Sequence, residues 1–177
     1  MSTRGIACLS VTLLAWVGCG STTTHERTVV VEKTVTAGGQ AATAARVRSD
    51  VEAFRSLDPA SRASTLTSFR SPTGNIGCHL GANFARCDIQ RRTWSSPPKP
   101  AECDLDWGQG VEVSAASPAV IVCAGDTALD PSAPVLSYGQ AAQVGSTECL
   151  SREDGVVCVR NGTGHGFFVA RERYVLF

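Results

Sequence analysis

The sequence NIGCHLGANFARCDI, at residues 75–89, contains two cysteines with eight residues between them, and STECLSREDGVVCVR, at residues 146–160, repeats this spacing. In the first stretch, a two-residue turn at Ala82-Asn83 would place Cys78 opposite Cys87 on adjacent antiparallel strands. Counting outward from the turn, this is a non-hydrogen-bonded pair, with a Cα separation of ~4.5 Å that a disulfide can span. The first stretch therefore predicts a disulfide-bridged β-hairpin.

The second stretch predicts the same arrangement, with Cys149 opposite Cys158 around Glu153-Asp154. Gly155 also suits a type I turn followed by a bulge, which would shift the register by one residue. By exclusion, Cys103 then pairs with Cys123. The alternatives are free thiols or a zinc site, but the sequence has no C-x-x-C motif and no Cys/His pattern at metal spacing.

The rest of the C-terminal part consists of short apolar runs separated by Gly and Pro. This pattern is typical of an all-β sandwich or small barrel. We expect one disulfide-stapled domain at residues 69–177, with about seven short strands at residues 75–80, 84–90, 110–114, 120–123, 144–150, 156–160 and 167–177.

One helix is expected before this domain. Val47, Val51 and Phe54 have the i, i+4, i+7 spacing of an amphipathic helix, predicted over residues 41–57 and ended by the Asp58-Pro59 step. We assign residues 44–68 to this helix and a connector. Residues 21–43 are rich in Thr, Ser, Gly and Ala and predict a flexible tether.

Residues 1–20 have the order of a signal peptide: a positive charge at Arg4, an apolar run and then small residues. Gly18-Cys19 is similar to the end of a bacterial lipoprotein signal, so Cys19 is the candidate lipidation site, although Trp16 departs from that pattern. The alternative is cleavage before Ser21, which would release a soluble protein. We therefore expect export, either to the outer face of the cell membrane through a lipid anchor or into the medium.

The charge balance argues against nucleic acid as a partner. Lys plus Arg and Asp plus Glu number 16 each, and acidic residues outnumber basic ones from Phe69 onward. Nucleic-acid binding needs a positive patch to neutralise phosphates.

Several motifs of the C-terminal part occur together in one family. On these motifs the chain resembles an uncharacterised domain of secreted proteins and lipoproteins in actinobacteria. The resemblance implies an exported protein and brings no known activity. The motifs are FRSPTGNIGC (69–78), RCDI (86–89), Trp94, Cys103, LDWG (105–108), CAGDT (123–127), LSYG (136–139) and GHGF (164–167).

Catalytic chemistry has few candidates. Bridged cysteines cannot act as thiolate nucleophiles, and a triad of His165, Asp126 and a serine would lack the usual G-x-S-x-G motif. We expect a non-enzymatic binding module that needs no cofactor and no metal. The alternative is a hydrolase that acts on envelope polymers.

The candidate binding surface consists of Trp94, Trp107, Tyr138 and His165. The three aromatic side chains could together offer a stacking platform for a sugar, although aromatic residues of small β domains usually belong to the core. The expected partner is an extracellular protein or a cell-wall glycan, and we expect a monomer.

Overall fold

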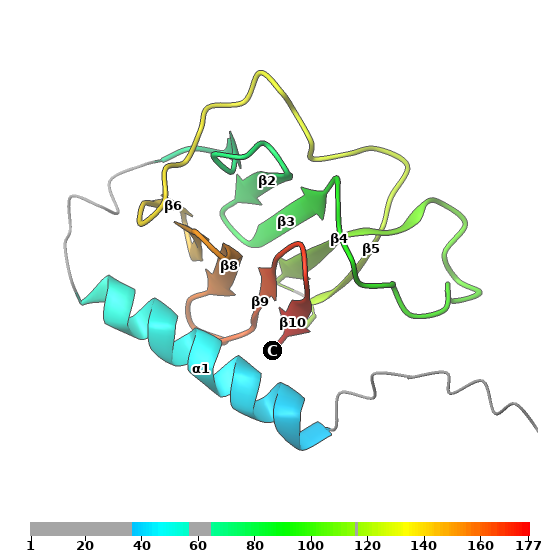
Figure 1. Ribbon diagram of the computed structural model, residues 1–177, viewed down its shortest axis with the longest axis horizontal. Helices are drawn as coiled ribbons and strands as arrows, with labels where there is room; N and C mark the ends of the chain where they lie inside the picture. The colour runs from blue at the N-terminus through cyan, green and yellow to red at the C-terminus, as the bar shows by residue number, and fades with distance from the viewer. Residues whose placement is uncertain (1–36, 57–64, 116) are drawn as a thin grey trace, which may run out of the picture. The chain divides into compact units, whose positions relative to one another are not determined.

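The computed structural model describes residues 37–56, 65–115 and 117–177. The predicted signal peptide, Cys19 and the first part of the predicted tether lie outside these residues. Within the described part, one helix, α1 (Ala37–Arg55), is followed by two antiparallel five-stranded sheets (Figure 1). The first sheet has the strands β1 (Ser68–Arg70), β2 (Ile76–Gly81), β3 (Phe84–Ile89), β4 (Trp107–Ser114) and β5 (Val120–Cys123). The second has β6 (Ala141–Val144), β7 (Thr147–Arg152), β8 (Gly155–Arg160), β9 (Gly166–Val169) and β10 (Tyr174–Leu176).

Each sheet is a meander in which every strand pairs with its neighbour in the chain. The all-β prediction is confirmed, and of its two alternatives the structure is a sandwich. The expectation of about seven strands was too low for three reasons. Residues 144–150 divide at Gly145, whose φ of 56° suits a tight turn. Residues 167–177 divide into β9 and β10, and β1 is too short to give a sequence signal.

Both cysteine hairpins have the predicted two-residue turns. Gly81 pairs with Phe84 around Ala82-Asn83, and Cys78 pairs with Cys87. In the second hairpin Arg152 pairs with Gly155, and Cys149 with Cys158, so the bulged alternative does not occur.

The main core lies between the two sheets. Residues alternate along each strand, so one face of every strand points inward. From the first sheet Val111 and Val113 of β4 are fully buried, and from the second Phe167 and Val169 of β9 are too. Because the four hairpin cysteines share these inward faces, both hairpin disulfides belong to this core.

Helix α1 covers a second apolar cluster on the other face of the second sheet. Val47 and Val51 of α1 are buried there against side chains of β7 to β10, including Val157, Phe168 and Val175. Asp50 of the helix also accepts a hydrogen bond from Arg152 at 2.8 Å. Two residues of the predicted amphipathic spacing, Val47 and Val51, therefore lie on the side of α1 that is buried against the second sheet.

The bounds of the helix differ from the prediction. It begins at Ala37, so it includes residues 37–43, which the sequence predicts to be part of the tether, and it ends at Arg55. Alanine has the highest helix propensity, and the Ala-rich sequence from residue 41 extends the helix back through Gly38-Gly39 in its first turn.

Candidate functional site

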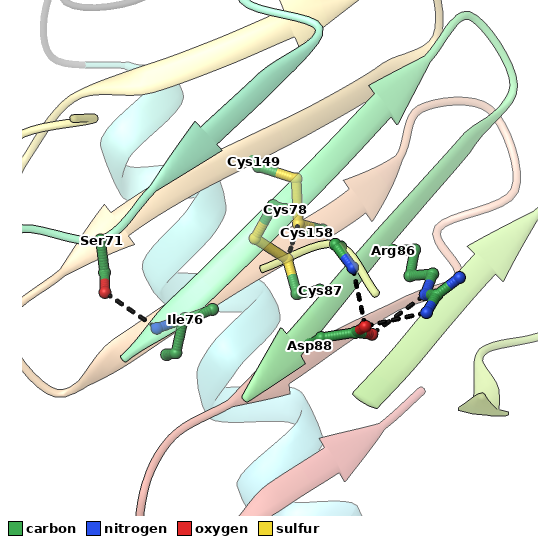
Figure 2. Close-up of a disulfide and its surroundings, with 9 residues drawn as sticks. Ser71, Ile76, Cys78, Arg86, Cys87, Asp88, Cys149 and Cys158 are labelled. Carbon is green, nitrogen blue, oxygen red and sulfur yellow. Dashed lines mark hydrogen bonds and ion pairs between the residues drawn. A yellow bond between two sulfur atoms is a disulfide. The ribbon is translucent and has the colours of Figure 1, made fainter. Parts of the chain in front are cut away.

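Three disulfides join the six C-terminal cysteines in the predicted pairs. Cys78–Cys87 and Cys149–Cys158 each bridge two adjacent strands, with a Cα–Cα distance of 4.1 Å, as expected for non-hydrogen-bonded pairs. Cys103–Cys123 ties the loop before β4 to the end of β5, and its Cys123 is exposed. Figure 2 shows the two core disulfides lying against each other.

The core sulfurs have a spacing that metal ligands can also have. The Sγ atoms of Cys87, Cys149 and Cys158 lie within 4.8 Å of one another. Each belongs to a disulfide, however, and a metal needs the thiolate form. In this oxidised state the three cysteines therefore offer no thiolate ligand.

A buried ion pair lies beside the first hairpin. The carboxylate of Asp88 is fully buried and accepts hydrogen bonds from Arg86 Nε at 3.0 Å and Arg86 Nη2 at 2.8 Å (Figure 2). It also accepts bonds from the Thr127 hydroxyl and the Ala128 N–H. Both oxygens of the Asp88 carboxylate thus accept hydrogen bonds, and such bonds offset the cost of burying a charged group.

Two glycines make room for this pair. Gly77 and Gly110 are the cross-strand neighbours of Asp88. A Cβ at Gly110 would collide with the Asp88 carboxylate, and one at Gly77 would collide with the carbonyl of Ala128. The loop after β5 can therefore lie close over the sheet and donate to Asp88.

Asp126 forms the exposed side of the same network. Arg86 Nη1 donates to its carboxylate at 2.6 Å. This hydrogen bond, together with the positive charge of Arg86, lowers the pKa of Asp126. For Arg86, burial lowers the pKa, but the bonds to Asp88 and Asp126 outweigh it and raise the pKa above its ordinary value.

A polar cleft of about 240 Å³ opens at one end of the sandwich. It lies among the turn between β1 and β2, the segment after β3, the loop before β6, the β7–β8 turn and the β9–β10 turn. Its residues are mostly polar or charged. They are Ser71, Thr73, Asn75, Ile76, Arg91, Tyr138, Arg152, Glu153, Asp154, Gly155, Ala170, Arg171 and Glu172.

Hydrogen bonds hold the two sides of the cleft in place. The side-chain amide of Asn75 accepts from the N–H of Arg91 at 2.9 Å and donates to its carbonyl at 3.0 Å. Across the sandwich, the carbonyl of Arg171 accepts from the N–H of Thr93 at 2.8 Å. The backbones of Arg91 and Arg171, one from each sheet, are thereby fixed on the same cleft.

The charges of the cleft fall into two groups. Arg152 is paired with Asp50 and Asp154, and Arg173 adds a second cation near Asp154 at 3.6 Å. The side chains of Arg91, Arg171, Glu153 and Glu172 have no ion pair or hydrogen bond with other described residues. These two cations and two anions are exposed and are available to a bound molecule.

The four residues of the predicted binding surface have different surroundings in the described structure. The ring of Trp94 contacts that of Tyr174 in a tilted arrangement, with centroids 4.6 Å apart, and the Trp94 indole N–H donates to the carbonyl of Ala170. Trp107 donates to the carbonyl of Pro97, and both tryptophans pack against the core. Tyr138, 40% exposed, lines the cleft.

His165 and Asp126 belong to different sites. His165 lies in the turn between β8 and β9, where its backbone N–H donates to the Thr163 hydroxyl. Asp126 is engaged by Arg86 of the first sheet. Among the described residues, no hydrogen bond links the His165 side chain to Asp126 or to a serine.

Sequence reasoning did not select Asn75, Arg91 or Arg171. Arg91 and Arg171 look like ordinary surface charges in the sequence, because their proximity depends on how the two sheets meet. Asn75 gave a weak signal, as a polar residue that directly precedes the apolar run of a strand.

Among the described residues, no helix is long and apolar enough to cross a membrane. No curated protein and no solved structure matches the chain. One family model does match, over residues 51–177, and it covers the last part of α1 and both sheets. The chain therefore belongs to that family, a family of unknown function designated DUF6636.

Proposed function

We propose that this protein is a non-enzymatic binding domain of the bacterial cell envelope and that its cleft recognises a polar segment of a cell-wall glycan. The observation that carries the proposal is the cleft itself, where exposed Tyr138 lies among polar side chains with free hydrogen-bonding capacity. Tyrosine offers an apolar ring face and a hydroxyl together, which suits a sugar ring with its hydroxyl groups.

The size of the cleft limits the ligand. Its volume of about 240 Å³ is below the 300–1,000 Å³ typical of pockets that enclose a small molecule, and would hold roughly eight waters at liquid density. Such a site suits one residue of a longer polymer. Charged side chains of both signs, Arg91 and Arg171 with Glu153 and Glu172, can bond hydroxyl groups as donors and acceptors.

The proposed compartment agrees with the cysteine chemistry. Disulfides persist in oxidising environments outside the cytoplasm, and three are present here. Together with the signal-like sequence of residues 1–20, this supports export, with a lipid anchor at Cys19 or release into the medium. Either route would bring the cleft to the envelope polymers.

Binding can be measured by titrating the domain with soluble cell-wall glycan fragments in a calorimeter. We expect Tyr138→Ala to weaken binding about twofold to thirteenfold, because an aromatic contact contributes about 0.5–1.5 kcal/mol. Arg91→Ala and Arg171→Ala should also weaken it. Val120→Ala is the matched control, since Val120 is 39% exposed, close to the 40% of Tyr138, but does not line the cleft.

Equal affinity of Tyr138→Ala and the unmodified domain would reject the cleft as the site, and absence of glycan binding would favour a protein partner. The hydrolase alternative is tested in the same samples. We expect chromatography after long incubation to show unchanged fragments. Release of shorter products would contradict a purely binding role.

A further inference from the structure

The two core disulfides touch each other across the sandwich. Cys87 Sγ of β3 lies 3.7 Å from Cys158 Sγ of β8, and all four hairpin cysteines are fully buried (Figure 2). Cys87 and Cys158 thus belong to different sheets, and their sulfurs are in van der Waals contact. Hairpin disulfides alone would not require this contact, because each is complete within its own pair of strands.

We propose that the four sulfurs form one thiol–disulfide exchange site with an alternative bridge, Cys87–Cys158, which links the two sheets. The reaction partner is a dithiol reductant. Its two electrons and two protons convert Cys78–Cys87 into two thiols, and the dithiol itself becomes a disulfide. The Cys87 thiolate then attacks Cys158 Sγ, the Cys87–Cys158 bond forms, and the Cys149–Cys158 bond breaks. Cys149 leaves as a thiolate and takes up the proton that Cys87 lost.

The same product forms from either side. If the reductant opens Cys149–Cys158 first, the Cys158 thiolate attacks Cys87 Sγ and Cys78 becomes the leaving group. Both routes end with an inter-sheet bridge and with thiols at Cys78 and Cys149. Cys78 lies outside the group of three sulfurs that are all within 4.8 Å of one another.

The exchange site differs from the third disulfide in its accessibility. Cys123 is exposed, whereas the hairpin cysteines are fully buried. A dithiol in solution should therefore reduce Cys103–Cys123 first, and the core sulfurs should react only when the sandwich opens locally. The exchange itself needs no further solvent access, because the contacting sulfurs are already adjacent. An in-line attack of Cys87 on Cys158 does need the Cys149–Cys158 bond to turn, because Cys149 Sγ lies within 4.8 Å of Cys87 Sγ, beside the contact and not opposite it.

Limited reduction of the whole protein tests the proposal. The protein is treated with substoichiometric dithiothreitol, quenched with iodoacetamide and mapped by peptide mass spectrometry without further reduction. Molecules that have lost one core disulfide should carry alkylated Cys78 and Cys149 and a Cys87–Cys158 linked peptide. Alkylation only in the native pairs, Cys78 with Cys87 or Cys149 with Cys158, would overturn the proposal.

Two double variants provide an independent test. Cys78→Ser with Cys149→Ser leaves the contacting sulfurs, and we expect air oxidation to form Cys87–Cys158 in nearly all molecules. Cys87→Ser with Cys158→Ser is the matched control and should keep two free thiols. Free thiols in both folded variants, or equal bridging in both, would contradict the inference. If neither variant folds, the limited-reduction map decides.

Discussion

Asp88 places a full negative charge inside the protein, and four donors from Arg86, Thr127 and Ala128 surround it. Asp88→Asn keeps the size of the side chain but turns an amide NH₂ toward donors of Arg86. Removing one partner of a buried pair costs about 3 kcal/mol or more, and we expect this loss in the free energy of unfolding. Urea denaturation with the disulfides intact measures it. A loss below about 1 kcal/mol would show that the pair contributes little.

Asp126 provides the exposed counterpart, since its side chain is 79% exposed and is held by the same Arg86. We expect Asp126→Asn to have a much smaller effect than Asp88→Asn at neutral pH. The pKa of Asp126 is lowered in the folded state, so its contribution is present above its unfolded pKa of about 3.9 and is lost as pH falls through the folded pKa. The difference in stability between unmodified protein and variant should therefore shrink as pH falls below about 4. A difference that grows in acid would contradict the assigned direction.

At the scale of single elements, the features that the sequence predicted well are local. The register of both cysteine hairpins follows from counting outward from a two-residue turn, and both are confirmed. The bounds of α1 were less predictable, because helix propensity in the Ala-rich stretch overcame the Gly38-Gly39 pair. Strand β1, with three residues, depends on its pairing with β2 and on the bond from the Arg70 N–H to Pro134, which no local pattern reveals.

The helix offers a test at the same scale. Val47 is buried at 4% exposure against the second sheet, whereas its neighbour Arg46 is exposed. Val47→Ala removes two methylene equivalents from this contact, and we expect it to lower the free energy of unfolding by about 1.5 kcal/mol. Arg46→Ala, the control, should change it by less than about 0.5 kcal/mol. If Val47→Ala and Arg46→Ala lowered the free energy of unfolding equally in urea denaturation, the contact of Val47 with the second sheet would not stabilise the domain.

At the scale of the whole molecule, the cleft could not be predicted from the sequence, because it forms where segments that are distant in the chain meet. The cleft combines five segments from both sheets, and Arg91 and Arg171, which lie far apart in the sequence, reach it from opposite sheets. The alternation of apolar and polar residues along a strand predicts which side chains point inward. It does not predict which ends of different strands lie next to each other. Trp94 and Trp107, two members of the candidate binding surface, show the same limit, because their partial burial against the core depends on how the two sheets meet.

The proposed attachment of the whole chain to the envelope depends on Cys19, which lies outside the described residues. Natively exported protein, analysed by intact mass and detergent partitioning, distinguishes the two possible signal endings. We expect a mature chain that begins at Cys19 with the added mass of a lipid and enters the detergent phase, because a covalent acyl anchor supplies about 0.8 kcal/mol of membrane affinity per buried CH₂. Cys19→Ser should abolish the lipid mass, while Cys8→Ser, the control within the apolar run, should leave it unchanged. A lipid-free chain that begins at Ser21 would show that the protein is secreted and not anchored.

The same intact-mass measurement counts the disulfides. Reduction should add about six protons, two for each of the three disulfides, and a smaller gain would reveal a bridge that does not form in the cell.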